Sequence, residues 1–206
     1  MNATNPKLPQ VISWVLHPLW VPVYLFAVLL AFDPYLQMQR PIAWYFAVVL
    51  CVSVLASALS ILMMRRSKSI SDLEVSVRKE RFAPFMVVLL YQGLALWTVQ
   101  GVPAYIPPGW FALLQAQLAV LAVAVLINLR FKASMHMMGT TGALGALTFF
   151  NRAHILGLDA WLPVLVLLCG AVAWARIRMG VHSVKEVLVG SLLGYFLMSS
   201  ILEVLL

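Results

Sequence analysis

Seven long apolar runs dominate this 206-residue sequence and limit what it can fold into. Most of them approach the roughly 20 residues that an α-helix needs to cross the hydrocarbon core of a bilayer. Backbone polar groups inside lipid must pair within their own segment, so we expect helices and not strands. The runs cover residues 11–32, 41–64, 84–100, 110–129, 137–150, 160–175 and 184–206.

Composition points the same way. The chain is 63% hydrophobic and only 10% charged, whereas a soluble domain is about half apolar and a quarter charged. These values exclude an ordinary soluble enzyme, a disordered protein and a nucleic-acid binder. The sequence therefore predicts an all-α fold, a multi-pass membrane helical bundle with six or seven transmembrane helices, formed by a single transmembrane domain over residues 1–206.

Several details refine this prediction. Residues 1–10 are polar, and the apolar run after them is too long for a signal peptide, so it is expected to remain as the first span. In the fifth run, glycines recur every three residues and predict a face for close helix packing. Cys51 and Cys169 lie within apolar runs and are predicted to be buried thiols. The glycines are Gly139, Gly142 and Gly145.

With seven spans, three polar segments emerge on the same side of the membrane as the N-terminus. They are residues 65–81, 130–136 and 176–186. With Lys7, these segments hold twelve of the 14 basic residues, and only Arg40 and Arg152 fall on the other side. Two of the four histidines, His136 and His182, lie in them as well. Three loops that are distant in sequence are thus expected to converge on one membrane face.

The chemistry of these segments suits a phosphate. If the last helix begins near His182, then His182 and Glu186 are four residues apart on one helix face. The carboxylate can then fix the imidazole tautomer and make the other ring nitrogen a better base or nucleophile. Cations hold the anion while the histidines move protons or bond to phosphorus. The candidate cations, with one neighbouring hydroxyl, are Arg176, Arg178, Arg78, Lys79, Arg81, Lys132 and Ser134.

Simpler readings stay open for each residue by itself. Basic residues beside membrane helices commonly set topology, and Glu186 near a helix start could merely complement the helix dipole. His17 and His154 have no comparable neighbours in sequence, and we treat both as structural. No cluster has metal-ligand spacing. A prenyltransferase would need paired aspartate-rich motifs, and this chain has none.

These segments resemble the type 2 phosphatidic acid phosphatase superfamily. Its third motif is Ser-Arg, five residues, His, three residues, Asp, and the spacing Arg176–His182–Glu186 matches it, with Ala175 for Ser and Glu for Asp. Its second motif, Pro-Ser-Gly-His, corresponds to Ala133-Ser134-Met135-His136. Its first motif, Lys, six residues, Arg-Pro, has only a loose counterpart in residues 78–84. The resemblance covers about residues 72–194 and is that of a divergent member.

The resemblance implies a lipid phosphate phosphatase that uses a phosphohistidine and neither metal nor cofactor. His182 would attack phosphorus, Glu186 would orient its ring, and His136 would protonate the leaving oxygen and later activate water. Phosphate ligands would be Arg176, Lys79, Arg81 and Ser134, with Arg78, Lys132 and Arg178 as second-tier candidates. A smaller hypothesis concerns Met135, whose side chain replaces glycine and is expected to restrict the pocket.

The expected partners are the bilayer and a membrane lipid phosphate, with no nucleic acid; a homo-oligomer is an open alternative. A bacterial inner membrane is the expected location. The basic-residue count favours a cytoplasmic site, whereas the family analogy favours a periplasmic one. Two alternative functions stay open, namely a catalytically impaired relative that binds or transports a lipid phosphate, and a lipid headgroup phosphotransferase.

Overall fold

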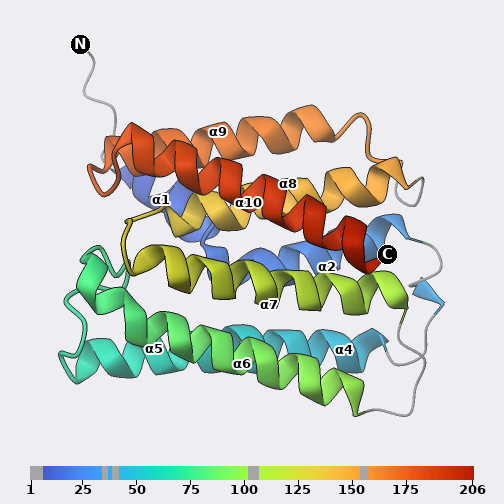
Figure 1. Cartoon of the computed structure of the whole chain (residues 1–206), viewed down its shortest axis with the longest axis horizontal. Helices are drawn as coiled ribbons and strands as arrows, with labels where there is room; N and C mark the ends of the chain where they lie inside the picture. Colours follow the sequence, from blue (N-terminus) through green and yellow to red (C-terminus); the bar gives the residue numbers. More distant parts are fainter. Residues whose placement is uncertain (1–6, 34–36, 39–41, 102–106, 154–156) are drawn as a thin grey trace. The chain divides into compact units, whose positions relative to one another are not determined.

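The computed structural model describes residues 7–33, 37–38, 42–101, 107–153 and 157–206, and these residues form an all-α protein (Figure 1). No strand occurs among them. The predicted fold class is therefore confirmed. The longer helices are α1 (Lys7–Val15), α2 (Val21–Phe32), α4 (Ile42–Val48), α5 (Ser57–Arg66), α6 (Phe82–Gln100), α7 (Pro108–Asn128), α8 (Met135–Arg152), α9 (Leu162–Arg178) and α10 (Val184–Leu205).

Five helical stretches are long and apolar enough to cross a membrane, as expected for a multi-pass membrane protein. They are Lys7–Phe32, Ile42–Arg66, Arg78–Gln100, Pro108–Asn128 and Val184–Leu205. Helix α9 has 17 residues, and α8 carries a histidine and three threonines among its 18. The precise number of crossings, six or seven, stays a prediction.

Two of the apolar runs are not single α-helices. In the first, α1 gives way to a short 3-10 turn, η1 (Pro18–Trp20), because Pro18 disfavours helical backbone at His17, which is extended. In the second, a π-helical segment, η2 (Val49–Ala56), joins α4 to α5. An apolar run looks the same in sequence whether or not its helix is interrupted, so neither interruption was predicted.

The chain divides into two compact units. Unit 1 contains the described residues of Met1–Val21 and Ala133–Glu203, and unit 2 contains those of Pro22–Lys132 and Val204–Leu206. Unit 1 therefore holds α1, η1, α8, α9 and nearly all of α10. Unit 2 holds nearly all of α2, then α4, η2, α5, α6 and α7.

Small residues allow α8 and α10 of unit 1 to pack closely. A Cβ at Gly145 would lie 2.6 Å from the carbonyl oxygen of Tyr195, and one at Gly142 would lie 3.5 Å from that of Gly194. Gly139 instead faces η1, where an added Cβ would lie 3.0 Å from Cβ of Pro18. The prediction that these three glycines form a packing face is confirmed, since small residues let helix backbones approach.

Unit 2 packs around its apolar helices with a few internal polar pairs. Gln92 on α6 donates to Gln117 on α7 at 3.0 Å, and Ser60 on α5 donates to Tyr91 on α6 at 3.2 Å. Such pairs satisfy polar side chains where no water is available. A short 3-10 turn, η3 (Arg78–Arg81), leads directly into α6.

One prediction about the thiols is wrong. Cys169 is buried as expected, but Cys51 is exposed on the surface of η2. A membrane helix presents apolar side chains to lipid as well as to its neighbours. An apolar setting in the sequence therefore does not show that a residue is in the core. Arg40 and His154 lie outside the described residues.

Candidate functional site

The turn between α9 and α10 places His182 at the start of the last helix. Gly180 has φ +68°, a left-handed conformation that glycine adopts at helix C-termini, and it follows the last residues of α9. No atom lies within 4 Å of a Cβ built on Gly180, so backbone conformation and not space requires glycine here. The chain then reverses, and α10 begins at Val184.

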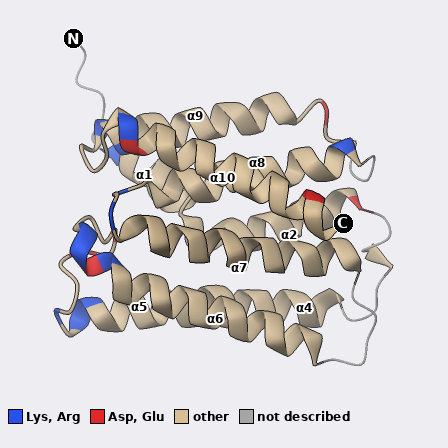
Figure 2. Cartoon of the chain, viewed as in Figure 1, with Lys and Arg blue, Asp and Glu red and all other residues tan. Residues whose placement is uncertain are grey.

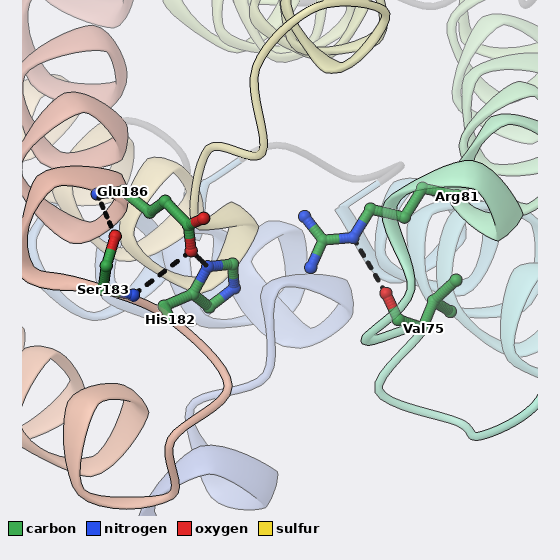
Figure 3. Close-up of polar contacts among 5 residues, drawn as sticks. All are labelled: Val75, Arg81, His182, Ser183 and Glu186. Atoms are coloured by element: carbon green, nitrogen blue, oxygen red, sulfur yellow. Dashed lines mark hydrogen bonds and ion pairs between the residues drawn. The ribbon is translucent and has the colours of Figure 1, made fainter.

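Ser183 and Glu186 cap α10 reciprocally. The Glu186 N–H donates to Oγ of Ser183 at 3.3 Å, and the Ser183 N–H donates to Oε2 of Glu186 at 3.2 Å (Figure 3). This is the capping box of a Ser-x-x-Glu sequence. Because both groups are fixed by backbone atoms, the carboxylate of Glu186 has a defined position beside the turn.

That carboxylate also contacts His182. The distance from Nδ1 of His182 to Oε2 of Glu186 is 2.8 Å (Figure 3). A carboxylate only accepts hydrogen bonds, so Nδ1 carries the proton and Nε2 keeps its lone pair. The His182 side chain is 1% exposed and that of Glu186 20%. The predicted contact between His182 and Glu186 is confirmed.

Ser134 brings the start of α8 against the start of α10. Its N–H donates to the Glu186 carbonyl at 3.1 Å. One turn further along α10, a Cβ at Gly190 would lie 2.6 Å from the Ser134 carbonyl oxygen, so only glycine permits this approach. The Ser134 hydroxyl is buried, does not cap α8, and has no hydrogen-bond partner among the described residues. Such a hydroxyl is available to a ligand.

A second polar cluster joins α1, α8 and α9. Nη1 of Arg176 donates to Oγ of Ser13 at 2.6 Å. Nε2 of His136 lies 3.2 Å from the same hydroxyl and 3.2 Å from the Ser13 carbonyl oxygen. All three residues are buried, with Arg176 only 1% exposed. The helix of unit 1 that comes first in the chain thus contributes directly to this cluster.

His136 lies in a positively charged environment. It is in the first turn of α8, before the apolar run that begins at Met137. Burial lowers its pKa well below 6.5, and the charge of Arg176 lowers it further. The rings of His17 and His136 meet edge to face, with centroids 4.8 Å apart. At neutral pH, His136 is therefore the neutral imidazole when no anion is present.

These contacts gather the chemistry of unit 1 at one end of three helices. The N-termini of α8 and α10 carry the positive ends of their helix dipoles, and Arg176 adds a full charge. An arrangement of helix N-termini, a buried guanidinium and a hydroxyl is suited to bind an anion. Two of the three polar segments that were expected to converge, residues 130–136 and 176–186, therefore meet around Ser134, His136, Arg176 and His182.

The remaining candidate cations belong to unit 2, apart from Arg178, which is exposed on the last turn of α9. Arg81 is 3% exposed, and its Nε donates to the Val75 carbonyl at 2.8 Å (Figure 3). Val75 has φ +46°, an unusual value for a β-branched residue. The loop is tied further by Glu80, which accepts hydrogen bonds from the N–H and hydroxyl of Ser71 at 2.7 and 2.8 Å.

The other unit 2 cations differ from Arg81. Nη1 of Arg78 donates to the carbonyls of Asn128 and Leu129 at 3.1 and 2.6 Å. It therefore caps the C-terminus of α7, where carbonyls have no partner within the helix. Lys79 is exposed and Lys132 is half-buried. In Figure 2, the lysines and arginines of each unit lie at or near helix ends, and the middle parts of the described helices carry no charged residue.

Sequence reasoning missed three residues. Ser183 could have been found, because Ser-x-x-Glu before an apolar run is a known helix-start pattern. The sequence predicts a structural role for His17, and its Nδ1 accepts a hydrogen bond from the Leu19 N–H at 3.3 Å. The His17 ring also contacts the ring of His136, which the sequence did not predict. Ser13 had no sequence signal, because a lone serine in an apolar run is common in membrane helices.

No group of three or more His, Cys, Asp or Glu side chains in the described part of the chain is arranged to hold a metal ion. Comparison of the chain with protein-family models, with curated proteins and with solved structures finds no match.

Proposed function

We propose that this protein is an integral membrane phosphatase that hydrolyses a lipid phosphomonoester or pyrophosphate through a phosphohistidine. One observation carries the proposal: unit 1 holds a glutamate-oriented His182, a second histidine and an unpartnered serine hydroxyl at the starts of α8 and α10, and a buried arginine in the last turn of α9. The motif spacing that resembles type 2 phosphatidic acid phosphatases supports the same reading.

In the first step, Nε2 of His182 attacks phosphorus. The N–P bond forms as the bond from phosphorus to the leaving lipid oxygen breaks, and His136 delivers a proton to that oxygen. Glu186 accepts the Nδ1–H of His182 at 2.8 Å. The carboxylate thereby stabilises the positive charge that the ring acquires when Nε2 is phosphorylated.

In the second step, water replaces His182. His136, neutral after giving up its proton, takes a proton from water, and the resulting hydroxide oxygen bonds to phosphorus as the N–P bond breaks. Inorganic phosphate and the free His182 lone pair are the products. Burial and the charge of Arg176 lower the pKa of His136. The ring is therefore unprotonated after the first step and can accept the proton of water.

The phosphate oxygens need donors that do not move during the reaction. In unit 1 these are Arg176, fixed on Ser13, and the hydroxyl of Ser134. The sequence resemblance adds Arg81 of unit 2, whose Nε donates to the Val75 carbonyl at 2.8 Å. Lys79 joins it as a ligand, and Lys132, Arg178 and Arg78 are second-tier candidates.

The substrate is proposed to be a membrane lipid phosphate. Along the sequence, the polar residues of the proposed site lie between long apolar helices. This suits an amphipathic substrate whose acyl or prenyl chain stays in the bilayer. The location proposed is a bacterial inner membrane. Charge bias favours a cytoplasmic site and the family resemblance a periplasmic one. Reporter fusions to the C-terminus decide between them, because with seven spans the C-terminus lies opposite the site and with six it lies on the same side.

One observation favours a binding or transport protein without turnover. The lowered pKa of His136 means that the histidine has no proton to deliver when the site holds no anion. The enzyme proposal answers this point, because a bound phosphate dianion offsets the charge of Arg176 and raises the pKa of His136. A headgroup phosphotransferase would use the same residues, with a lipid alcohol in place of water.

The test is phosphate release by the purified protein in detergent, measured on a panel of lipid phosphomonoesters and pyrophosphates with and without EDTA. We expect release that survives EDTA and is lost in both His182→Ala and His136→Ala. Glu203→Gln, an exposed change at the far end of α10, is the control and should keep full activity.

Three outcomes separate the proposals. Release that EDTA abolishes would exclude a metal-independent reaction. No release from any lipid, together with tight lipid phosphate binding, would establish the binding protein in place of the enzyme. Transfer of phosphate to an added lipid alcohol at the expense of release would identify the transferase.

A further inference from the structure

A backbone carbonyl near the end of α1 lies against a histidine of the site. At this end of the helix the Leu16 N–H donates to the Ile12 carbonyl at 3.0 Å. The next residue, His17, is extended because Pro18 follows it. The Ser13 carbonyl comes immediately after that of Ile12, and it lies 3.2 Å from Nε2 of His136. A proline-induced helix end thus turns a carbonyl toward a histidine of another helix.

The direction of these hydrogen bonds follows from the atoms involved. A carbonyl oxygen can only accept, so Nε2 of His136 must carry a hydrogen. A guanidinium can only donate, so the Ser13 hydroxyl oxygen accepts from Nη1 of Arg176 at 2.6 Å. Both polar contacts of the His136 ring, with the hydroxyl and the carbonyl oxygen of Ser13, involve Nε2. Nδ1 has no hydrogen bond among the described residues, and a neutral ring keeps its lone pair there.

We propose that Ser13 is a positioning residue: it fixes His136 as the Nε2–H tautomer and orients Arg176, so that Nδ1 of His136 exchanges protons with the substrate and with water. This inference rests on the proposed function, which it deepens by naming the reacting atom. One buried residue of α1 thereby couples the proton-transferring histidine on α8 to the phosphate-holding arginine on α9.

A purely structural role for Ser13 makes different predictions. A serine between membrane helices can act simply as polar glue, in which case its loss lowers stability and leaves catalysis unchanged. A positioning role changes the reaction instead. Arg176 then loses the hydrogen bond to Ser13 that orients Nη1, and phosphate binding and the pH dependence of turnover change while the fold persists.

The first test reads the tautomer and needs no turnover. Protein labelled with ¹⁵N-histidine in detergent is examined by NMR at pH 7.5, and His136 is assigned by its absence in His136→Gln. We expect ¹⁵N shifts of a protonated Nε2 and an unprotonated Nδ1, both in the wild type and in Ser13→Ala, which keeps the carbonyl. A protonated Nδ1 in the wild type would overturn the proposal, whether or not the protein is an enzyme.

The second test is kinetic and uses matched serines. Ser13→Ala should lower kcat/KM about 10- to 100-fold, mainly through KM, because a displaced arginine binds phosphate less well. The acid limb of its kcat/KM profile should move, since Arg176 acts on His136. Ser191→Ala removes a hydroxyl that only bonds the Val187 carbonyl within α10, and it should change neither quantity.

Two further results complete the design. His136→Gln keeps a donor for the Ser13 carbonyl, so it should fold with wild-type thermal stability and still lack turnover. If Ser13→Ala unfolds or leaves kcat/KM and its pH profile unchanged, Ser13 is only a packing residue. Absence of turnover in the wild type with the expected tautomer would refute the phosphatase and leave the assignment of Nε2–H intact.

Discussion

Each unit of this protein buries an arginine near the start or end of a helix, and the two arginines have different surroundings. Arg176 of unit 1 bonds a serine hydroxyl that also contacts His136. Arg81 of unit 2 bonds the backbone carbonyl of Val75, in a loop tied by Glu80. Residues 22–132 contain no histidine.

The comparison shows that a buried cation does not by itself define a reaction centre. Both side chains are nearly inaccessible and both are fixed by a hydrogen bond, so both can hold an anion. Within its own unit, Arg176 has a histidine beside it that can move protons, whereas residues 22–132 offer Arg81 no histidine. The proposed chemistry therefore rests on the residues of unit 1, and the part of Arg81 stays a prediction from the sequence.

The largest expected effect tests whether the chemistry belongs to unit 1. His182→Gln should lower kcat for lipid phosphate hydrolysis at least about 10³-fold, because the nucleophile is lost. The fold should persist, since Ser183 and Glu186 still cap α10. Activity within threefold of the wild type would place the chemistry elsewhere.

The next effect compares the two arginines directly. Arg176→Lys should lower kcat/KM about 100-fold, because an ammonium cannot keep both the Ser13 bond and a bidentate hold on phosphate. Arg81→Lys should lower it about 10-fold, chiefly by raising KM. The control is Arg152→Lys, an exposed change at the other end of α8, which should have no effect. Equal effects on kcat from Arg176→Lys and Arg81→Lys would abolish the distinction between the units.

Glu186→Gln should reduce kcat about 10-fold or more, because the amide no longer stabilises positive charge on His182. A glutamine can still cap α10, so the melting temperature should stay within a few degrees of the wild type. Glu203→Gln on the same helix provides the matched comparison. An unchanged kcat in Glu186→Gln would reduce the glutamate to a helix cap.

Met135→Gly tests the expected restriction beside the second histidine. Removing a side chain next to Ser134 should widen the range of lipids accepted, with a change of severalfold in kcat/KM for bulkier headgroups. The measurement is the same lipid panel used for the wild type. If range and rate stay the same, Met135 does not shape the pocket.

The smallest effect concerns the turn that carries His182. Gly180→Ala forces a Cβ into the left-handed region and should cost about 1 kcal/mol of stability, seen as a fall of a few degrees in melting temperature. Gly170→Ala within α9 also has nothing within 4 Å of its added Cβ, and it should not lower stability because alanine favours helix. A tolerated Gly180→Ala would show that the turn does not depend on glycine.

Much of the fold followed from the sequence, because the period and length of apolar runs are strong signals for membrane helices. Helix α10 was expected over 184–206 and spans Val184–Leu205. The pairing of His182 with Glu186 was equally accessible, since it needs only a helix start and a four-residue spacing. The proximity of residues 130–136 to residues 176–186 followed from counting spans.

What the sequence did not reveal depends on tertiary contacts. Ser13 is one serine among many, and its proposed role depends on contacts that form only where the end of α1 meets α8 and α9. The exposure of Cys51 was missed because apolar side chains face lipid and protein alike. Arg78 looked like a phosphate ligand by charge, yet it bonds the carbonyls at the end of α7.

The central claim is that His182 bonds covalently to phosphorus. The most direct measurement is rapid quenching in alkali, which preserves phosphohistidine, after mixing the protein with a lipid phosphate radiolabelled on phosphorus. We predict label bound to the wild-type protein that is stable in alkali, released by acid and absent from His182→Ala. Equal labelling of His182→Ala, or rapid phosphate release from the wild type with no protein-bound label, would contradict this account.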